Sequence, residues 1–209
     1  MSYRTICVSR DAGAAGEEIG QAVATSLGFR YVDEDIVRAA ADRTGVDLET
    51  AMSAEQRRTL AHKLLDLLAQ NGGALGSYAF APELHHSGVT TDSGQQIPEV
   101  IREVVRETAD AGEAVIVAHA ASHVLAGRPE VLRTLVTASP QVRAKRLGEL
   151  PGVGDGEAAV READKARADY LQRFHEVKRE LPTHYDLVLN TDMLSIGAAA
   201  AVIADAATR

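Results

Sequence analysis

Short apolar runs alternate with helical segments along the chain, and this alternation restricts its fold more than any other feature. The apolar runs lie at residues 5–9, 29–33, 113–118, 132–138 and 185–190. The segments between them carry apolar residues at helical spacing. Most of the runs are too apolar for one face to meet water, so they predict a parallel sheet covered on both sides. The expected fold class is therefore α/β, with three layers, a five-stranded parallel sheet and helices on both faces.

The boundaries of the helical segments are marked by capping and stop signals. The first helix is expected to begin near Gly16 and to end at Gly28. The other expected helices cover residues 35–43, 54–70, 96–111, 140–147, 157–179 and 195–207. The helix over 54–70 follows a capping-box pattern, Ser53-x-x-Gln56, and its leucine face (Leu60, Leu64, Leu67, Leu68) is interpreted as core or as a homodimer contact.

Composition narrows the classes of partner. The 209 residues suit one domain, and the formal net charge of −8 argues against broad binding to polymeric nucleic acid. The single cysteine, Cys7, and the lack of a signal-peptide pattern point to a cytoplasmic location. No apolar run is long enough to span a membrane, so we expect no membrane partner.

The stretch VSRDAGAAGEEIG, residues 8–20, is the candidate site, because ligands of such folds bind beyond the carboxyl ends of the strands. Its glycines allow a close approach of the backbone, and free amides at the start of the helix form an anion site without a lysine. Glu17 and Glu18 would compete with a phosphate for the same positive helix end. From these residues alone, a phosphate-binding loop and a plain strand–turn–helix connection remain equal alternatives.

Five segments together resemble a known family. They read ICVSRDAGAAGEEIGQAVATSLGFRYVDEDIV, EAVIVAHAASHVLAG, LVTASPQVRAKRLGE, VREADKARADYLQRF and HYDLVLNTDMLSI. In this order they resemble the cytidylate kinase-like proteins, a branch of the P-loop nucleoside monophosphate kinases, with residues 45–95 unmatched. The resemblance implies a single P-loop kinase-like domain with its core at 1–34, 96–138 and 182–209. It also implies an acceptor-binding helical insert at about 35–95 and a lid at about 139–181.

The resemblance implies phosphoryl transfer from ATP with Mg²⁺ to a small nucleotide such as CMP, and it assigns roles to residues. The arginines expected to act in catalysis are Arg10, Arg143, Arg146 and Arg167. The expected nucleotide-binding residues are Ser9, Arg10, Gly13, Ala14, Ala15, Gly16, Glu17 and Glu18. The acceptor-binding candidates are Asp33, Arg38 and His119, and Glu18 is the candidate Mg²⁺ ligand.

Departures from the family pattern leave a second function open. The loop has no lysine, Gly16-Glu17 stands where the related branch has an arginine, and Ala118-His119 replaces a Gly-Arg pair. Each loss removes a charged contact to phosphate, and a lost transition-state donor can cost about a hundredfold in rate. The alternative is a catalytically degenerate protein that binds a nucleotide or another anion and has a regulatory role.

Some charged residues have simpler interpretations. Arg143 and Arg146 could form a solvated helix face, and Arg167 with Asp164 could form a surface pair at i, i+3. The polar residues His62, His85, His86 and Asp92 match no metal-ligand spacing and are interpreted as solvated. His119 and His123 stand at i, i+4, which is better spacing for a metal or a phosphate.

Overall fold

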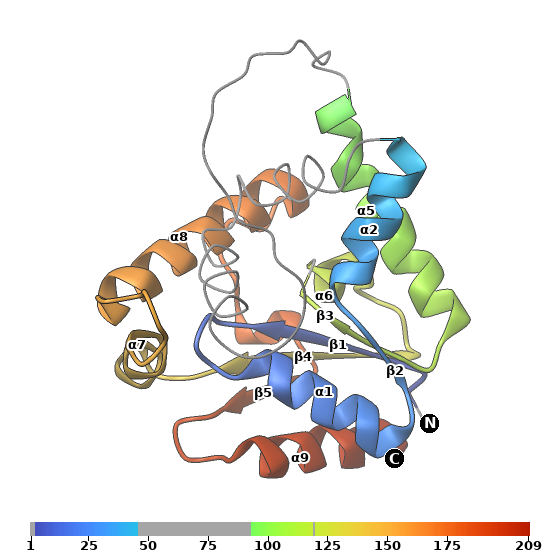
Figure 1. Cartoon of the computed structure of the whole chain (residues 1–209). Helices are drawn as coiled ribbons and strands as arrows, with labels where there is room; N and C mark the ends of the chain where they lie inside the picture. The colour runs from blue at the N-terminus through green and yellow to red at the C-terminus, as the bar shows by residue number, and fades with distance from the viewer. Residues whose placement is uncertain (1–2, 46–92, 119) are drawn as a thin grey trace.

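A five-stranded parallel sheet forms the centre of the protein, in the strand order β2-β3-β1-β4-β5. The computed structural model describes residues 3–45, 93–118 and 120–209 (Figure 1). The strands are β1 (Thr5–Arg10), β2 (Arg30–Val32), β3 (Ala114–Val117), β4 (Val131–Thr137) and β5 (Leu187–Asn190). The helices are α1 (Gly16–Leu27), α2 (Glu34–Thr44), α5 (Ser93–Ala111), α6 (Ala121–Val124), α7 (Pro140–Gly148), α8 (Gly156–His175), η1 (Pro182–His184) and α9 (Ile196–Thr208).

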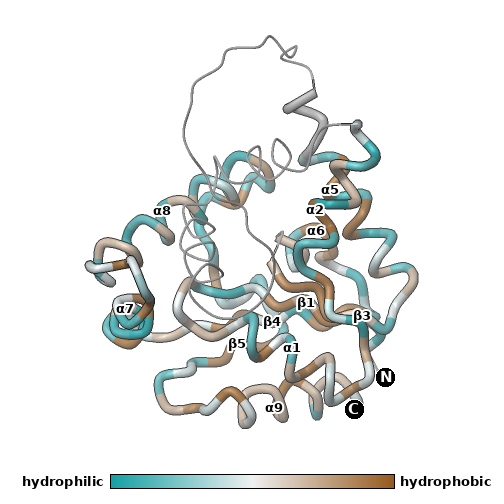
Figure 2. The backbone as a smooth tube through the Cα atoms, in the orientation of Figure 1, coloured by the Kyte–Doolittle hydropathy of each residue, from teal (hydrophilic) through white to brown (hydrophobic). Residues whose placement is uncertain are grey.

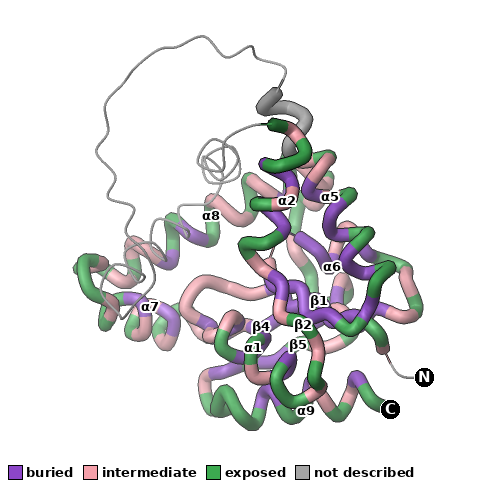
Figure 3. Tube along the Cα trace, turned by 45° about the vertical axis from the view of Figure 1, so that its right-hand side comes forward, coloured by how far each residue is buried: buried purple, intermediate pink, exposed green. Residues whose placement is uncertain are grey.

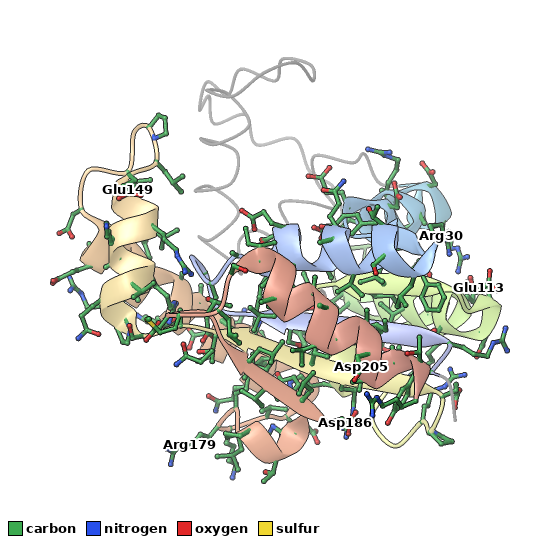
Figure 4. The ribbon with its side chains drawn as sticks, turned by 90° about the horizontal axis from the view of Figure 1, so that it is seen from below. Arg30, Glu113, Glu149, Arg179, Asp186 and Asp205 are labelled. Atoms are coloured by element: carbon green, nitrogen blue, oxygen red, sulfur yellow. The ribbon has the colours of Figure 1, made fainter. Side chains whose placement is uncertain are left out.

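Helices cover both faces of the sheet, as the apolar strands require. Ile6 and Val8 of β1 pack with α1 and α9, whereas Cys7 packs with α2, α5 and α6 on the opposite face. The strands are the most hydrophobic part of the tube in Figure 2, and burial is greatest there and on the inner helix faces in Figure 3. Figure 4 shows α9, which carries Asp205, beside α1 on one face. The three-layer α/β fold predicted from the sequence is therefore confirmed.

Most element boundaries agree with the sequence predictions to within two or three residues. Gly28 and Gly45 end α1 and α2 in the left-handed conformation. The predicted helix 157–179 is too long, because α8 ends at His175 and Glu176 turns into the left-handed region with φ 56°. The short helix α6 was not predicted. The predicted helix 54–70, its leucine face and the histidine-containing loop lie outside the described residues.

Helices α7 and α8 form a pair that stands at the carboxyl ends of β4 and β1 (Figure 1). Ser139 caps α7 by accepting a hydrogen bond from the Val142 amide at 3.4 Å, as its position before Pro140 predicts. The two helices meet very closely at Gly156, where an added Cβ would lie 1.9 Å from the carbonyl oxygen of Ala144. Only glycine fits that contact. Within the described parts of the chain, no helix is long and apolar enough to cross a membrane.

Candidate functional site

The loop between β1 and α1 has two residues with positive φ just before the first turn of the helix. Gly13 and Ala15 both adopt the left-handed conformation, with φ 80° and 64°. Ala15 is the N-cap of α1 and makes no side-chain hydrogen bond to the first turn. None of the described residues accepts a hydrogen bond from the amides of Gly16 and Glu17, which open the helix. The positive end of α1 is thus uncapped and faces the loop.

Three consecutive carbonyl groups of this loop are held by side chains from distant elements. The carbonyl oxygen of Ala12 accepts from Arg143 Nε at 2.7 Å, and that of Gly13 accepts from Arg146 Nη1 at 3.1 Å. The carbonyl oxygen of Ala14 lies 3.0 Å from Thr191 Oγ1. In a trans peptide the N–H points opposite to the preceding C=O, so these contacts direct the following amides away from the side chains that hold the carbonyls. Of these amides, that of Ala14 donates to the Asp11 carbonyl at 3.0 Å.

Two loop glycines are required by close packing. A Cβ at Gly13 would lie 2.9 Å from the backbone oxygen of Arg143, in addition to the strain of a positive φ. A Cβ at Gly16 would lie 2.4 Å from Cβ of Arg10. The loop is therefore pressed between α7 on one side and the end of β1 on the other.

Arg10 is paired with an acidic residue of the loop itself. Its Nε forms an ion pair with Glu17 in the first turn of α1, and only 11% of the Arg10 side chain is exposed. Asp33 lies nearby and accepts a hydrogen bond from the Tyr31 hydroxyl at 3.2 Å. Burial, followed by the charges of Asp33 and Glu17, raises the pKa of Tyr31 well above its usual range. This side of the loop is therefore rich in negative charge.

Arg143 and Arg146 are not a solvated helix face. Arg143 is 4% exposed, and its two Nη atoms bond Asp164 on α8 at 3.2 and 2.5 Å. Arg146 donates to the carbonyl of Thr191 at 2.7 Å as well as to the loop. Both arginines thus connect the α7–α8 pair to the candidate loop.

Arg167 does not pair with Asp164, its neighbour at i, i+3. It forms two hydrogen bonds to Glu180, at 2.7 and 2.6 Å. Glu180 also accepts from the Tyr185 hydroxyl and lies 3.8 Å from His123 Nε2. Burial alone would raise the pKa of Glu180, but the neighbouring His123 together with the hydrogen bonds from Arg167 and Tyr185 holds it far below its usual range.

This network continues to the end of β1. Ser9 donates to Ser122 of α6 at 3.0 Å, and both are buried. His123 follows Ser122, and its ring lies 5.6 Å from that of His184 and 6.2 Å from that of His175. Burial and the charge of Arg102 lower the pKa of His175 to about 4, so this imidazole is neutral at physiological pH.

The remaining candidates are less closely connected to the loop. Glu18 is exposed on the first turn of α1. Arg38 is exposed, with its guanidinium 3.5 Å from Asp35. His119 lies outside the described residues. Among the residues that the structure describes, no group of three His, Cys, Asp or Glu side chains could hold a metal ion.

Three side chains of this region were not found from the sequence. Asp11 accepts from Thr137 Oγ1 at 2.5 Å, Glu180 binds Arg167, and Thr191 joins Arg146 to the loop. Asp11 lies within the stretch 8–20 that the sequence marks as the candidate site, so it could have been found from its position there. Glu180 and Thr191 offered none, because only the folded chain brings them to their partners.

One solved structure shares this architecture, and two others are less similar. The crystal structure of an uncharacterized protein from Eubacterium ventriosum is similar, with a TM-score of 0.61 at 16% identity over 97% of each chain. A shikimate kinase from Bacteroides thetaiotaomicron has a TM-score of 0.49 at 14% identity, also over 97% of each chain. An unliganded sugar kinase from Janibacter sp. HTCC2649 has a TM-score of 0.46 at 14% identity, over 98% of this chain and 92% of that one.

No curated protein matches the chain in sequence. The family model described as the cytidylate kinase-like family matches residues 5–193. This match includes the loop, the α7–α8 pair and Thr191. Family membership supports a phosphotransferase-like or nucleotide-binding function in general terms. The protein belongs to the cytidylate kinase-like family.

Proposed function

We propose that the protein binds ATP at the β1–α1 loop and transfers its γ-phosphoryl group to a small acceptor of the nucleoside monophosphate type. The observation that carries the proposal is the direction of the loop peptides. Side chains hold the carbonyls of Ala12, Gly13 and Ala14, so the amides of Gly13 and Ala15 point away from these side chains, next to the uncapped start of α1. An array of amides at a helix N-terminus is suited to a phosphate group.

In this proposal the chain supplies positive charge mainly from its backbone and from arginines. Phosphoryl transfer depends on positioning and on spreading charge over the phosphate oxygens rather than on covalent chemistry. Arg10 lies at the loop and can exchange its Glu17 partner for a phosphate oxygen. Arg143 is tied to Asp164 and Arg146 to backbone carbonyls, so they serve first to hold the loop and the lid helices.

The metal is expected to arrive with the nucleotide. Since no described cluster of side chains could hold an ion by itself, the phosphate oxygens would provide most of the ligands, with Glu18 as the candidate carboxylate. Bound Mg²⁺ neutralises charge on the β- and γ-phosphates. Asp33, Arg38 and His119 remain the candidates for the acceptor.

A second function, nucleotide or anion binding without turnover, is favoured by one observation. Arg10, the arginine at the end of β1 beside the loop, has its charge offset by an ion pair with Glu17. Loss of a free cation at the transferring phosphate would slow transfer more than it would weaken binding.

Thermal unfolding with ATP, ADP and each nucleoside monophosphate, with and without Mg²⁺, tests the binding step. A ligand at one hundred times its Kd adds about 2.7 kcal/mol to stability. A coupled assay for ADP production then tests transfer. Stabilisation by ATP together with acceptor-dependent ADP supports the kinase. Stabilisation without ADP on any acceptor supports the second function. No stabilisation by any nucleotide contradicts the kinase and leaves, of the second function, only the binding of another anion.

A further inference from the structure

Thr191 is a buried hydroxyl residue that connects the end of β5 to the candidate loop. It follows Asn190, the last residue of β5, and is only 2% exposed. Its Oγ1 accepts a hydrogen bond from Arg146 Nη1 at 3.0 Å. The acceptors for its single proton are the carbonyl oxygen of Ala14 at 3.0 Å and that of Thr137 at 3.2 Å, of which Ala14 is the closer. The contact joins residues that are 177 positions apart in the chain.

Arg146 closes this connection into a small network. The same Nη1 donates to the carbonyl of Gly13 at 3.1 Å, and Nη2 donates to the carbonyl of Thr191 at 2.7 Å. The backbone of Thr191 is fixed in turn, because its amide donates to the carbonyl of Thr137 at 2.8 Å. The Thr191 side chain therefore projects from a backbone segment that is hydrogen-bonded to the sheet.

The network acts on the peptide where the loop backbone is least favourable. Ala15 has φ 64°, a conformation that costs a residue with a Cβ roughly 1–2 kcal/mol. A contact that holds the Ala14 carbonyl also fixes the plane of the Ala14–Ala15 peptide, and so fixes the direction of the Ala15 N–H. Without it, that peptide is free to rotate toward a more favourable conformation.

We propose that Thr191 is a positioning residue for the phosphate site: its hydroxyl, together with Arg146, holds the Ala14–Ala15 peptide so that the Ala15 amide points toward the bound phosphate. This inference rests on the proposed function for the identity of the ligand. Its structural half, the anchoring of the loop, can be measured without any ligand.

The chain offers a matched control for this residue. Thr134 is also a fully buried threonine whose hydroxyl donates to a β1 carbonyl, that of Cys7, at 2.9 Å. Cys7 lies in the middle of β1 and not in the loop. Thr134→Val therefore removes the same chemical group at the same depth, and differs from Thr191→Val in what the hydroxyl holds.

The experiment compares Thr191→Val, Thr191→Ser and Thr134→Val in the full chain. Isothermal titration with ATP and Mg²⁺ should show about tenfold weaker binding for Thr191→Val, the effect of one lost hydrogen bond. Thr191→Ser and Thr134→Val should stay within about twofold of the wild type. Hydrogen exchange of the segment 12–17 should be faster in Thr191→Val than in either of the other two.

Two results would overturn the inference: Thr191→Val binding as tightly as the wild type, or Thr134→Val losing as much affinity as Thr191→Val. If the wild type binds no ATP, the proposed function fails, and the anchoring is then judged by exchange alone, with equal exchange in Thr191→Val and Thr134→Val overturning it. Should Thr191→Val not fold, Arg146→Gln tests the same network by the same readouts.

Discussion

Arg10 and Glu17 form an ion pair across the mouth of the β1–α1 loop, with the arginine largely buried and the glutamate in the first turn of α1. The Glu17 carboxylate thus offsets the charge of the Arg10 guanidinium, which would otherwise attract a phosphate. The pair explains how an acidic loop and an arginine coexist there. If the loop binds a phosphate as proposed, Glu17 competes with it for Arg10 and for the helix end.

Glu17→Gln is therefore expected to tighten ATP binding by about three- to tenfold, because it removes a negative charge from the positive helix end and releases Arg10. The same change should lower the free energy of unfolding by about 0.5–1 kcal/mol, since the helix dipole loses a favourable charge. Isothermal titration and urea denaturation measure the two effects. Equal or weaker ATP binding by the variant would show that Glu17 does not compete.

Glu18→Gln tests the role of the neighbouring exposed glutamate as a metal ligand. We expect weaker ATP binding in the presence of Mg²⁺ and unchanged binding in EDTA, because a carboxylate is a hard ligand for Mg²⁺ whereas an amide binds it more weakly. Titrations under both conditions give the ratio directly. An affinity for Mg²⁺–ATP equal to that of the wild type removes Glu18 from the metal site.

Gly13→Ala should destabilise the protein more than Gly28→Ala. Both glycines have positive φ, 80° and 70°, but a Cβ at Gly13 would meet the Arg143 backbone at 2.9 Å, whereas Gly28 has no neighbour within 4 Å. The left-handed conformation costs roughly 1–2 kcal/mol at either position. The contact should add about 1–3 kcal/mol at Gly13 alone.

Urea denaturation of the two variants measures that difference. Gly28→Ala is the control, because it shares the backbone strain and lacks the contact. Equal destabilisation of the two variants would mean that the Arg143 backbone does not approach Gly13 as closely as the structure shows.

The network around Glu180 predicts a pH dependence of stability. Its folded-state pKa lies below the unfolded value of about 4.3, so the stabilisation is present above that pH and is lost as the pH falls toward the folded pKa. Glu180→Gln should therefore lower the free energy of unfolding by about 1–3 kcal/mol at pH 7. The gap to the wild type should shrink below about pH 4.

The control is Glu149→Gln, at an exposed position that follows α7 (Figure 4), where the carboxylate lies 4.0 Å from Lys145 Nζ. This variant should match the wild type at every pH. Denaturation at a series of pH values distinguishes the two. A Glu180→Gln deficit that stays constant down to pH 3 would contradict the assignment.

Local patterns predicted the sheet, the loop glycines and most helix ends, because each depends on residues close in sequence. Gly28 and Ser139 are examples, and both cap helices as expected. The helix end at His175 was missed because Glu176, and not a glycine, adopts the left-handed conformation.

The partners of the arginines could not be predicted in the same way. Arg143 meets Asp164 from another helix, and Arg167 meets Glu180 beyond the end of its own helix. Thr191 reaches the loop from the opposite end of the chain. Each pairing follows from the packing of α7, α8 and β5 at one edge of the sheet, which a periodicity argument does not describe.

The central claim is that backbone amides of the β1–α1 loop bind phosphate without a lysine. A crystal structure with a non-hydrolysable ATP analogue tests it most directly. We predict phosphate oxygens within hydrogen-bond distance of the amides of Gly13, Ala15 and Gly16. A well-ordered nucleotide bound elsewhere, with these amides facing away from its phosphates, would contradict the claim.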